Sequence, residues 1–191
     1  MRPARRMADS DHFRSWEITG AAHSSYFSEQ YRTPIVERDF GTDVWPATCT
    51  KPPFSRVRGP DVINVQYDLL VRWIKENVAP PSAPKIEFTS AEPPTMVRDE
   101  LGFARGGIRL PDVAAPVALH TGVNSGSTFC GLYGSYEPFD AATLNKLYPD
   151  ATAYRAAVKQ SAEQNVAAGY ILPGAAEALV RAAESANVPP R

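Results

Sequence analysis

Apolar residues recur at helical spacing most clearly over residues 61–79. Every third or fourth position in this stretch is apolar, as in a helix that buries one face. The stripe consists of Val62, Val65, Leu69 and Trp73. Asp61 is placed to cap the first turn with its carboxylate, and Pro80 and Pro81 cannot continue the helix. The pattern therefore predicts a helix over residues 61–79.

The end of the chain carries a second set of helical patterns. A short helix is predicted over residues 141–148, because Asp140 can cap its first turn. Longer helices are predicted over residues 151–168 and 174–186, where apolar and small residues recur three or four positions apart. Small side chains allow close packing, so we expect these helices to form a tail that packs on the rest of the domain.

Residues 13–18 have the pattern of a short strand that ends at Gly20 and leads His23 onto the following loop. The side chains available for burial are Phe13, Trp16 and Ile18. A side chain just past the carboxyl end of a strand lies at the rim of an open α/β sheet, where ligands bind. His23 is therefore the candidate catalytic residue of this sequence.

Two long stretches lack a sustained period. Residues 26–60 are rich in Pro and Gly, which predicts a long irregular connection that either lines a binding cleft or covers a sheet edge. Residues 83–138 are also loop-like, although 86–88 could pair as an edge strand. Prolines in residues 111–119 exclude this apolar stretch from a central strand and favour a course over the surface.

Composition limits the classes of protein to consider. A chain of 191 residues with 43% hydrophobic content can form one domain with a real core. A net charge of -1 argues against nucleic-acid binding, which needs an excess of Lys and Arg. No apolar stretch follows the basic N-terminus or could cross a membrane. We therefore expect no membrane role and a cytoplasmic location by default, with secretion if the start of the sequence is truncated.

The two cysteines, Cys49 and Cys130, are too few for a metal site or a disulfide scaffold. A single bridge between them and a pair of buried free thiols both remain open. Neither a metal ion nor a cofactor is predicted for this chain.

Several stretches carry a family resemblance. Residues 16–23 read Trp-Glu-Ile-Thr-Gly-Ala-Ala-His, and the other matching segments are residues 78–84, 106–122 and 129–140. Together they resemble the C-terminal portion of α/β-hydrolase-fold proteins of a little-characterised hydrolase family, from residue 11 to about residue 188. In that family a similar last strand precedes the histidine of the catalytic triad. The resemblance thus implies that His23 is a general base, and that residues 61–79 form the helix that closes the domain against its sheet.

The remaining parts of a triad are missing from the sequence. In this fold the chain order is Ser, then Asp or Glu, then His, but only twelve residues precede the predicted strand and no Gly-x-Ser-x-Gly is present. Ser125, Ser127 and Ser135 come nearest and are interpreted as turn residues. Asp11 is too close in sequence to be the acid, and the direction of Glu17 depends on the pleat.

The other histidines, His12 and His120, are given no catalytic role. In the resembling family an acidic residue often follows the triad histidine, whereas this chain has Ser24 and Ser25.

The predicted fold is α/β-derived: an incomplete α/β-hydrolase fold with its last strand and closing helix, long Pro-rich loops and a helical C-terminal tail. We expect four regions in the chain. They are a disordered N-terminus (1–10), the C-terminal part of a hydrolase domain (11–82), an extended loop-rich segment (83–138) and the helical tail (139–191).

The predicted function is that of the C-terminal segment of a serine hydrolase acting on carboxylic esters, inactive alone because the nucleophile and acid are absent. The alternative is a non-catalytic binding or interaction protein derived from a hydrolase. A misplaced start or a split gene, with an upstream segment supplying the serine, is also open. The expected partner is an N-terminal hydrolase segment or a second copy that covers the exposed sheet and helix face.

Overall fold

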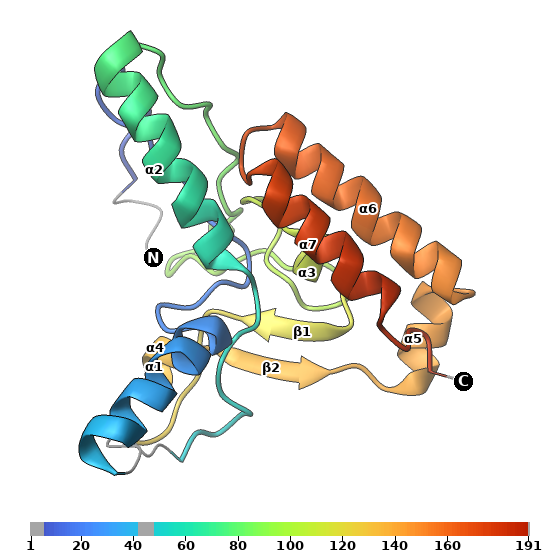
Figure 1. The fold of residues 1–191 in the computed structure, drawn as a ribbon. Coiled ribbons are helices and arrows are strands. Elements are labelled where there is room, and N and C mark those ends of the chain that lie inside the picture. The colour runs from blue at the N-terminus through green and yellow to red at the C-terminus, as the bar shows by residue number, and fades with distance from the viewer. Residues whose placement is uncertain (1–5, 42–47, 191) are drawn as a thin grey trace.

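The computed structural model describes residues 6–41 and 48–190, which contain seven helices and one two-stranded sheet (Figure 1). Residues 1–5 of the expected disordered N-terminus lie outside the described residues. The elements in chain order are α1 (Tyr26–Phe40), α2 (Gly59–Glu76), α3 (Pro111–Ala114), β1 (Ala118–Thr121), α4 (Cys130–Tyr133), β2 (Ser135–Pro138), α5 (Ala141–Leu147), α6 (Ala151–Ala167) and α7 (Pro173–Glu184).

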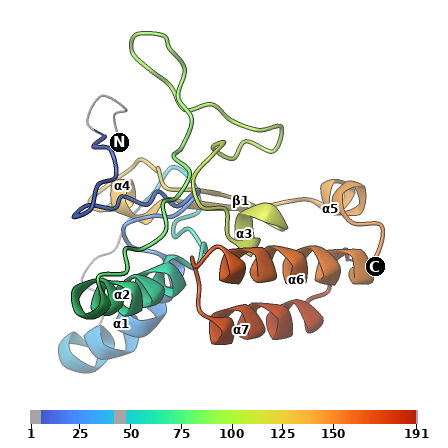
Figure 2. The same ribbon diagram turned by 90° about the horizontal axis from the view of Figure 1, so that it is seen from above.

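One hydrophobic core joins distant parts of the sequence. The strands β1 and β2 pair antiparallel, α3 contacts both β1 and α6, and α6 packs against α7 (Figure 2). Buried side chains come from before α2, from the middle of the chain and from the last helices, and include Val57, Phe103, Ile108, Leu110, Val158 and Leu179. The C-terminal helices therefore cover the same core as the segments near the N-terminus.

The helix predicted over residues 61–79 is present as α2, but both of its ends differ from the prediction. The helix begins at Gly59 with Arg58 at the N-cap position, so Asp61 lies within the first turn and does not cap it. Its Oδ2 accepts a hydrogen bond of 2.7 Å from Arg58 Nε. At the other end Asn77 adopts a left-handed conformation with φ of 57° and stops the helix before the two prolines are reached. Only Val62 and Val65 of the stripe are fully buried.

The C-terminal helices follow the prediction closely. Asp140 accepts a hydrogen bond of 2.8 Å from the Thr143 amide, and Asp150 does the same for Ala153. Each carboxylate satisfies an amide that has no partner within its helix. These caps explain why α5 and α6 begin where the sequence places them.

Residues 26–60 differ most from the prediction of an irregular connection. Residues 26–40 form α1, which contains Pro34 and has no buried residue. A helix without a buried face needs no apolar stripe, so the spacing of apolar residues did not indicate a helix here. Its C-terminus is set by Gly41, whose φ is 75°.

The stretch from residue 111 to 119 is also not the surface segment that was expected. Pro111 begins α3, where a missing amide costs nothing at the first turn, and Val113 is buried. Residues 118–121 then form β1 at the centre of the molecule (Figure 1). The prolines lie before the strand, so they do not interrupt its hydrogen bonds.

Residues 13–18 do not form a regular strand. Their extended backbone makes a single parallel bridge between Ile18 and Ile108, with a hydrogen bond of 3.0 Å from the Thr19 amide to the Ile108 carbonyl. The Ile108 amide donates to the Glu17 carbonyl at 2.7 Å. Residues 86–106 form a set of isolated antiparallel bridges, in the long loops that extend to one side in Figure 2.

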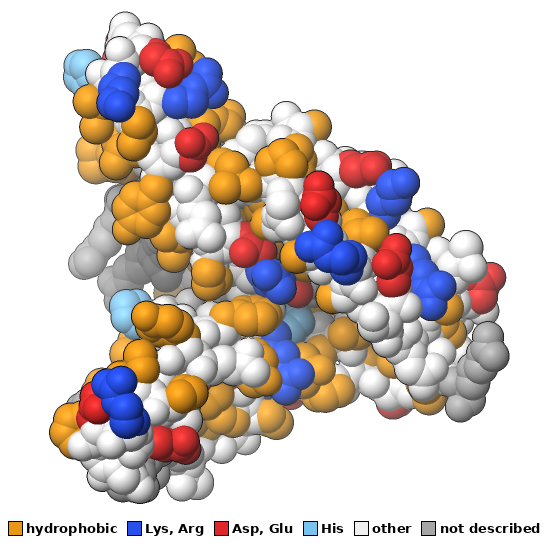
Figure 3. Space-filling model, viewed as in Figure 1, with side chains coloured by type: hydrophobic (Ala, Val, Ile, Leu, Met, Phe, Trp, Pro, Cys, Tyr) orange, Lys and Arg blue, Asp and Glu red, His pale blue; other side chains and the backbone are white. Residues whose placement is uncertain are grey.

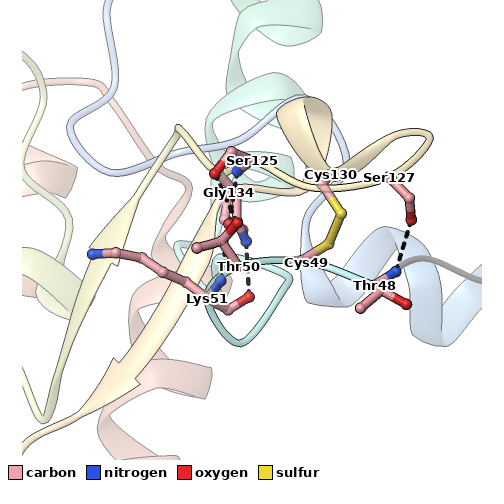
Figure 4. Close-up of a disulfide and its surroundings, with 9 residues drawn as sticks. Thr48, Cys49, Thr50, Lys51, Ser125, Ser127, Cys130 and Gly134 are labelled. Atoms are coloured by element: carbon pink, nitrogen blue, oxygen red, sulfur yellow. Dashed lines mark hydrogen bonds between the residues drawn. A yellow bond between two sulfur atoms is a disulfide. The ribbon is translucent and has the colours of Figure 1, made fainter.

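A disulfide joins Cys49 to Cys130, which decides between the two alternatives left open by the sequence (Figure 4). The bond links the chain between α1 and α2 to α4, with Cα atoms 5.5 Å apart. Hydrogen bonds run beside it, from the Thr48 amide to Ser127 Oγ at 2.9 Å and from the Thr50 amide to the Ser125 carbonyl at 2.8 Å. The disulfide thus holds two loops that are far apart in sequence.

Removal of this disulfide is expected to destabilise the protein. The bond closes a loop of 81 residues, so the double variant Cys49→Ser/Cys130→Ser should lose about 2–4 kcal/mol of unfolding free energy. Urea denaturation measured with and without dithiothreitol checks this. Reductant should shift the native protein toward the variant and leave the variant unchanged; equal midpoints for native protein in both conditions would contradict the prediction.

Candidate functional site

The loop that carries His23 is fixed by backbone contacts on both sides. Gly20 accepts a hydrogen bond of 2.7 Å from Ser55 Oγ, and the Ser24 amide donates to the Leu132 carbonyl at 3.0 Å. Gly20 has φ of 75°, a conformation that favours glycine, and a Cβ there would lie 3.1 Å from the His120 carbonyl oxygen. The turn after the 16–20 segment therefore depends on close packing against β1.

The His23 side chain itself is exposed. Among the residues that the structure describes, none makes a hydrogen bond or ion pair with its imidazole. The carboxylate of Glu17 is directed elsewhere: it accepts hydrogen bonds from Arg6 Nε at 2.7 Å and from the Ile86 amide at 2.7 Å. Glu17 thus forms a structural ion pair with Arg6 and does not orient His23.

The serines nearest to a nucleophile motif are occupied in structural contacts. Ser125 Oγ donates to Thr50 Oγ1 at 2.9 Å, and Ser127 Oγ accepts from the Thr48 amide (Figure 4). Ser135 is fully buried and bonds to Thr121 Oγ1 at 2.9 Å. Ser125 and Ser127 hold neighbouring loops together outside the helices and strands, as predicted, whereas Ser135 is the first residue of β2 and not the turn residue that was expected.

A cavity of about 390 Å³ lies beside the segment that leads to His23. Its walls include Trp16, Ile18, Phe88 and His120, and the His23 ring is not part of them. The cavity is therefore formed mainly by apolar side chains of the extended segments, at a different position from the exposed imidazole.

His120 is the histidine that the sequence interpretation left without a role. It lies on β1 and is only 4% exposed. Its Nδ1 accepts a hydrogen bond of 3.2 Å from the Arg56 amide, which assigns the remaining proton to Nε2. Burial, together with the nearby Arg56 guanidinium, lowers the pKa of His120 to about 4. The sequence Ala-Leu-His-Thr of residues 118–121 does not alternate apolar and polar residues, so no local pattern indicated that His120 is buried.

His120 also faces a second cavity, of about 310 Å³, between α1, α6 and α7. Arg56, Arg58 and Asp112 contribute charged groups to its walls. Burial raises the pKa of Asp112 to about 6, although the Arg58 amide donates a hydrogen bond to its Oδ2 at 3.2 Å. This cavity brings together two arginines, a carboxyl group and a neutral imidazole. The His23 imidazole, in contrast, has no hydrogen-bond or ion-pair partner among the described residues.

Within the described ranges, 6–41 and 48–190, no group of three or more His, Cys, Asp or Glu residues is arranged to hold a metal ion. In the same ranges, no helix has both the length and the apolar character needed to cross a bilayer.

The lowered pKa of His120 predicts that the stabilisation which this residue contributes is lost in acid. Because the pKa is lowered from 6.5 to about 4 in the folded state, the unfolded state takes up the proton first as the pH falls. The stabilisation is therefore complete above pH 6.5 and is lost between pH 6.5 and about 4, with a total of about 3 kcal/mol.

Urea denaturation across this pH range tests the prediction with two variants. The difference in unfolding free energy between the native protein and His120→Gln should change as the pH falls from 6.5 to about 4, because the opposite contribution of Asp112, whose pKa is raised, is common to both proteins. The difference between the native protein and the control His12→Gln, which removes an exposed histidine, should stay constant. An NMR titration midpoint for His120 at or above 6.5 would contradict the assignment.

Comparisons with known proteins give one clear result. A family model described as an alpha/beta hydrolase domain matches residues 1–181. Searches of curated proteins and of solved structures gave no match. The family match covers the His23 loop, the disulfide, β1, β2 and nearly all of the helices. The chain therefore belongs to the alpha/beta hydrolase domain family.

Proposed function

We propose that this chain is the C-terminal segment of a serine hydrolase that acts on carboxylic esters, with His23 as its general base. The observation that carries the proposal is the exposed imidazole on a fixed loop, directly after the extended segment that pairs with Ile108. A general base must reach the nucleophile and must be oriented by a second group. An exposed His23 without either partner matches a base whose partners belong to another segment.

The fold is interpreted in the same way. We propose that residues 16–20 correspond to the last strand of an incomplete α/β-hydrolase fold, and that α2 is its closing helix. The proposed regions are the hydrolase part (11–82), the extended segment (83–138) and the tail (139–191). The common core that joins Val57, Ile108 and Leu179 supports a tail that packs on the same domain.

A partner surface follows from this interpretation. Large apolar side chains are exposed along α2, a helix whose other face packs on the core. They are Ile63, Tyr67, Leu70, Val71 and Ile74. Exposed apolar patches of this kind mark interaction sites. We propose an N-terminal hydrolase segment as the partner, and a second copy of the chain as the alternative.

A non-catalytic binding protein is the second candidate function. The cavity between α1, α6 and α7 favours it, because that cavity is lined by polar and apolar groups without any contribution from His23. Binding there would not require a serine nucleophile.

The disulfide also bears on location. Disulfides persist in oxidising compartments and are rare in the cytosol. We therefore propose the secreted location in place of the cytoplasmic default, with the bond between Cys49 and Cys130 as the supporting observation.

The first test concerns the chain alone. Purified protein should show no turnover of short-chain p-nitrophenyl esters above background and no labelling by a fluorophosphonate probe, because the described serines near a candidate motif are held in structural hydrogen bonds. Turnover that the probe abolishes, with the label on a serine of this chain, would show that the nucleophile is present after all.

The second test restores the missing groups. The chain is co-expressed with the serine- and acid-bearing remainder of a full-length member of the family, and ester hydrolysis is measured. His23→Ala should lower kcat by about 10⁴-fold or more, as loss of a triad base does. The matched control His12→Ala, also an exposed histidine, should retain activity. Full activity of the His23 variant would remove His23 from the mechanism and leave the binding function as the better explanation.

A further inference from the structure

The cavity between α1, α6 and α7 contains an arginine whose position is set by aromatic rings. The Arg56 guanidinium lies 4.6 Å from the ring centroid of Tyr26 and 3.9 Å from that of Tyr136. No described carboxylate forms an ion pair with it. Stacking on two rings restricts the guanidinium while its N–H groups remain available, which is the arrangement used to bind carboxylates and phosphates.

A second donor lies beside this arginine. The ring centroids of His120 and Tyr136 are 5.3 Å apart with the planes tilted by 45°, so His120 and Arg56 both contact the Tyr136 ring. Because Nδ1 of His120 accepts the Arg56 amide, its Nε2 carries the proton, and no described residue accepts a hydrogen bond from it. A neutral imidazole that is 4% exposed on a cavity wall thus has an N–H without a protein partner.

The other charged side chains on the walls, Arg58 and Asp112, each have a partner in the protein. Arg58 Nε donates to Asp61 at 2.7 Å, and the Arg58 guanidinium lies 5.0 Å from the Phe27 ring centroid. Asp112 accepts a hydrogen bond from the Arg58 amide. Of these cations, only Arg56 remains without an anionic partner among the described residues, so the cavity has a positive end.

The opposite walls of the cavity are apolar. They are formed by side chains of α6, α7 and the segment before β1, including Ala115, Val117, Val158 and Leu179. Figure 3 shows a hollow on this face between α1 and α7, with Lys or Arg side chains at its edges. A ligand that satisfies both ends needs one anionic group and an apolar body.

We propose that this cavity binds a small aliphatic carboxylate, with Arg56 and His120 Nε2 as donors to the carboxylate and the apolar walls of α6 and α7 against the chain of the ligand. A carboxylate matches the fork of a guanidinium and accepts a further hydrogen bond from the imidazole. The volume of about 310 Å³ is within the range of small-molecule sites. This proposal does not depend on the catalytic role of His23.

The test uses the full chain with its disulfide intact and octanoate as the probe. At neutral pH, octanoate should shift the NMR signals of the His120 ring in a saturable way. Octanol, which has the same apolar chain without the charge, should bind at least about tenfold more weakly, because hydrogen bonds to charged groups contribute more than neutral ones. Inorganic phosphate, which lacks the apolar body, should also bind more weakly than octanoate.

Variants locate the site. Arg56→Gln should weaken octanoate binding by about tenfold or more, whereas Arg38→Gln, an exposed arginine of α1 that pairs with Asp39, should bind as the native protein does. Ala182→Trp, which places a large ring at the cavity wall, should also weaken binding. Circular dichroism of each variant checks that it is folded, and His23→Ala should bind octanoate normally.

Four results would overturn the proposal. They are the absence of a saturable shift of the His120 signals, equal affinity for octanoate and octanol, equal affinity for octanoate and phosphate, and unchanged binding by a folded Arg56→Gln variant. Because His23→Ala separates the two sites, failure of this proposal would leave the proposed hydrolase function unaffected.

Discussion

The pairing of residues 17–19 with residues 106–108 is the constraint on which the rest of the structure depends. Ile18 and Ile108 form the parallel bridge, and Thr19 Oγ1 donates to the Gly106 carbonyl at 2.7 Å. At Gly107 a Cβ would lie 2.7 Å from Thr19 Oγ1, so only glycine permits this approach. The two backbones meet closely because no side chain separates them.

The carboxylate of Glu17 reinforces this pairing. It is almost fully buried, and its oxygens accept hydrogen bonds from Arg6 and from the Ile86 amide. A buried carboxylate is tolerated only when such partners offset its lost hydration. Hydrogen bonds of this ion pair with the Ile86 backbone thus tie the beginning of the chain to its middle. The pairing of Ile18 with Ile108 fixes the backbone that leads to the His23 loop. It also anchors that backbone to the core, because Ile108 is a core residue.

The disulfide and the helices that cover the core lie at opposite ends of the small sheet. The bond between Cys49 and Cys130 holds the loops that precede α2 and β2, while α3, α6 and α7 cover the other side of the structure. Between these two regions the chain leaves the cavity of Arg56 and His120. The cavity depends on side chains from α1, β1, β2 and α7, so it exists only in the assembled fold.

Helices with a buried stripe or a capping carboxylate were determined by the sequence alone. The α2 stripe and the cap Asp140 were predicted from local spacing, since helix burial and capping act within a few residues. The resemblance to the hydrolase family came separately, from the residues of segments such as 16–23. Tertiary structure decided the rest. It made a helix of residues 26–40 without an apolar face, buried His120, and brought Arg56 between two tyrosines. Those features come from contacts between residues far apart in sequence, which no local pattern records.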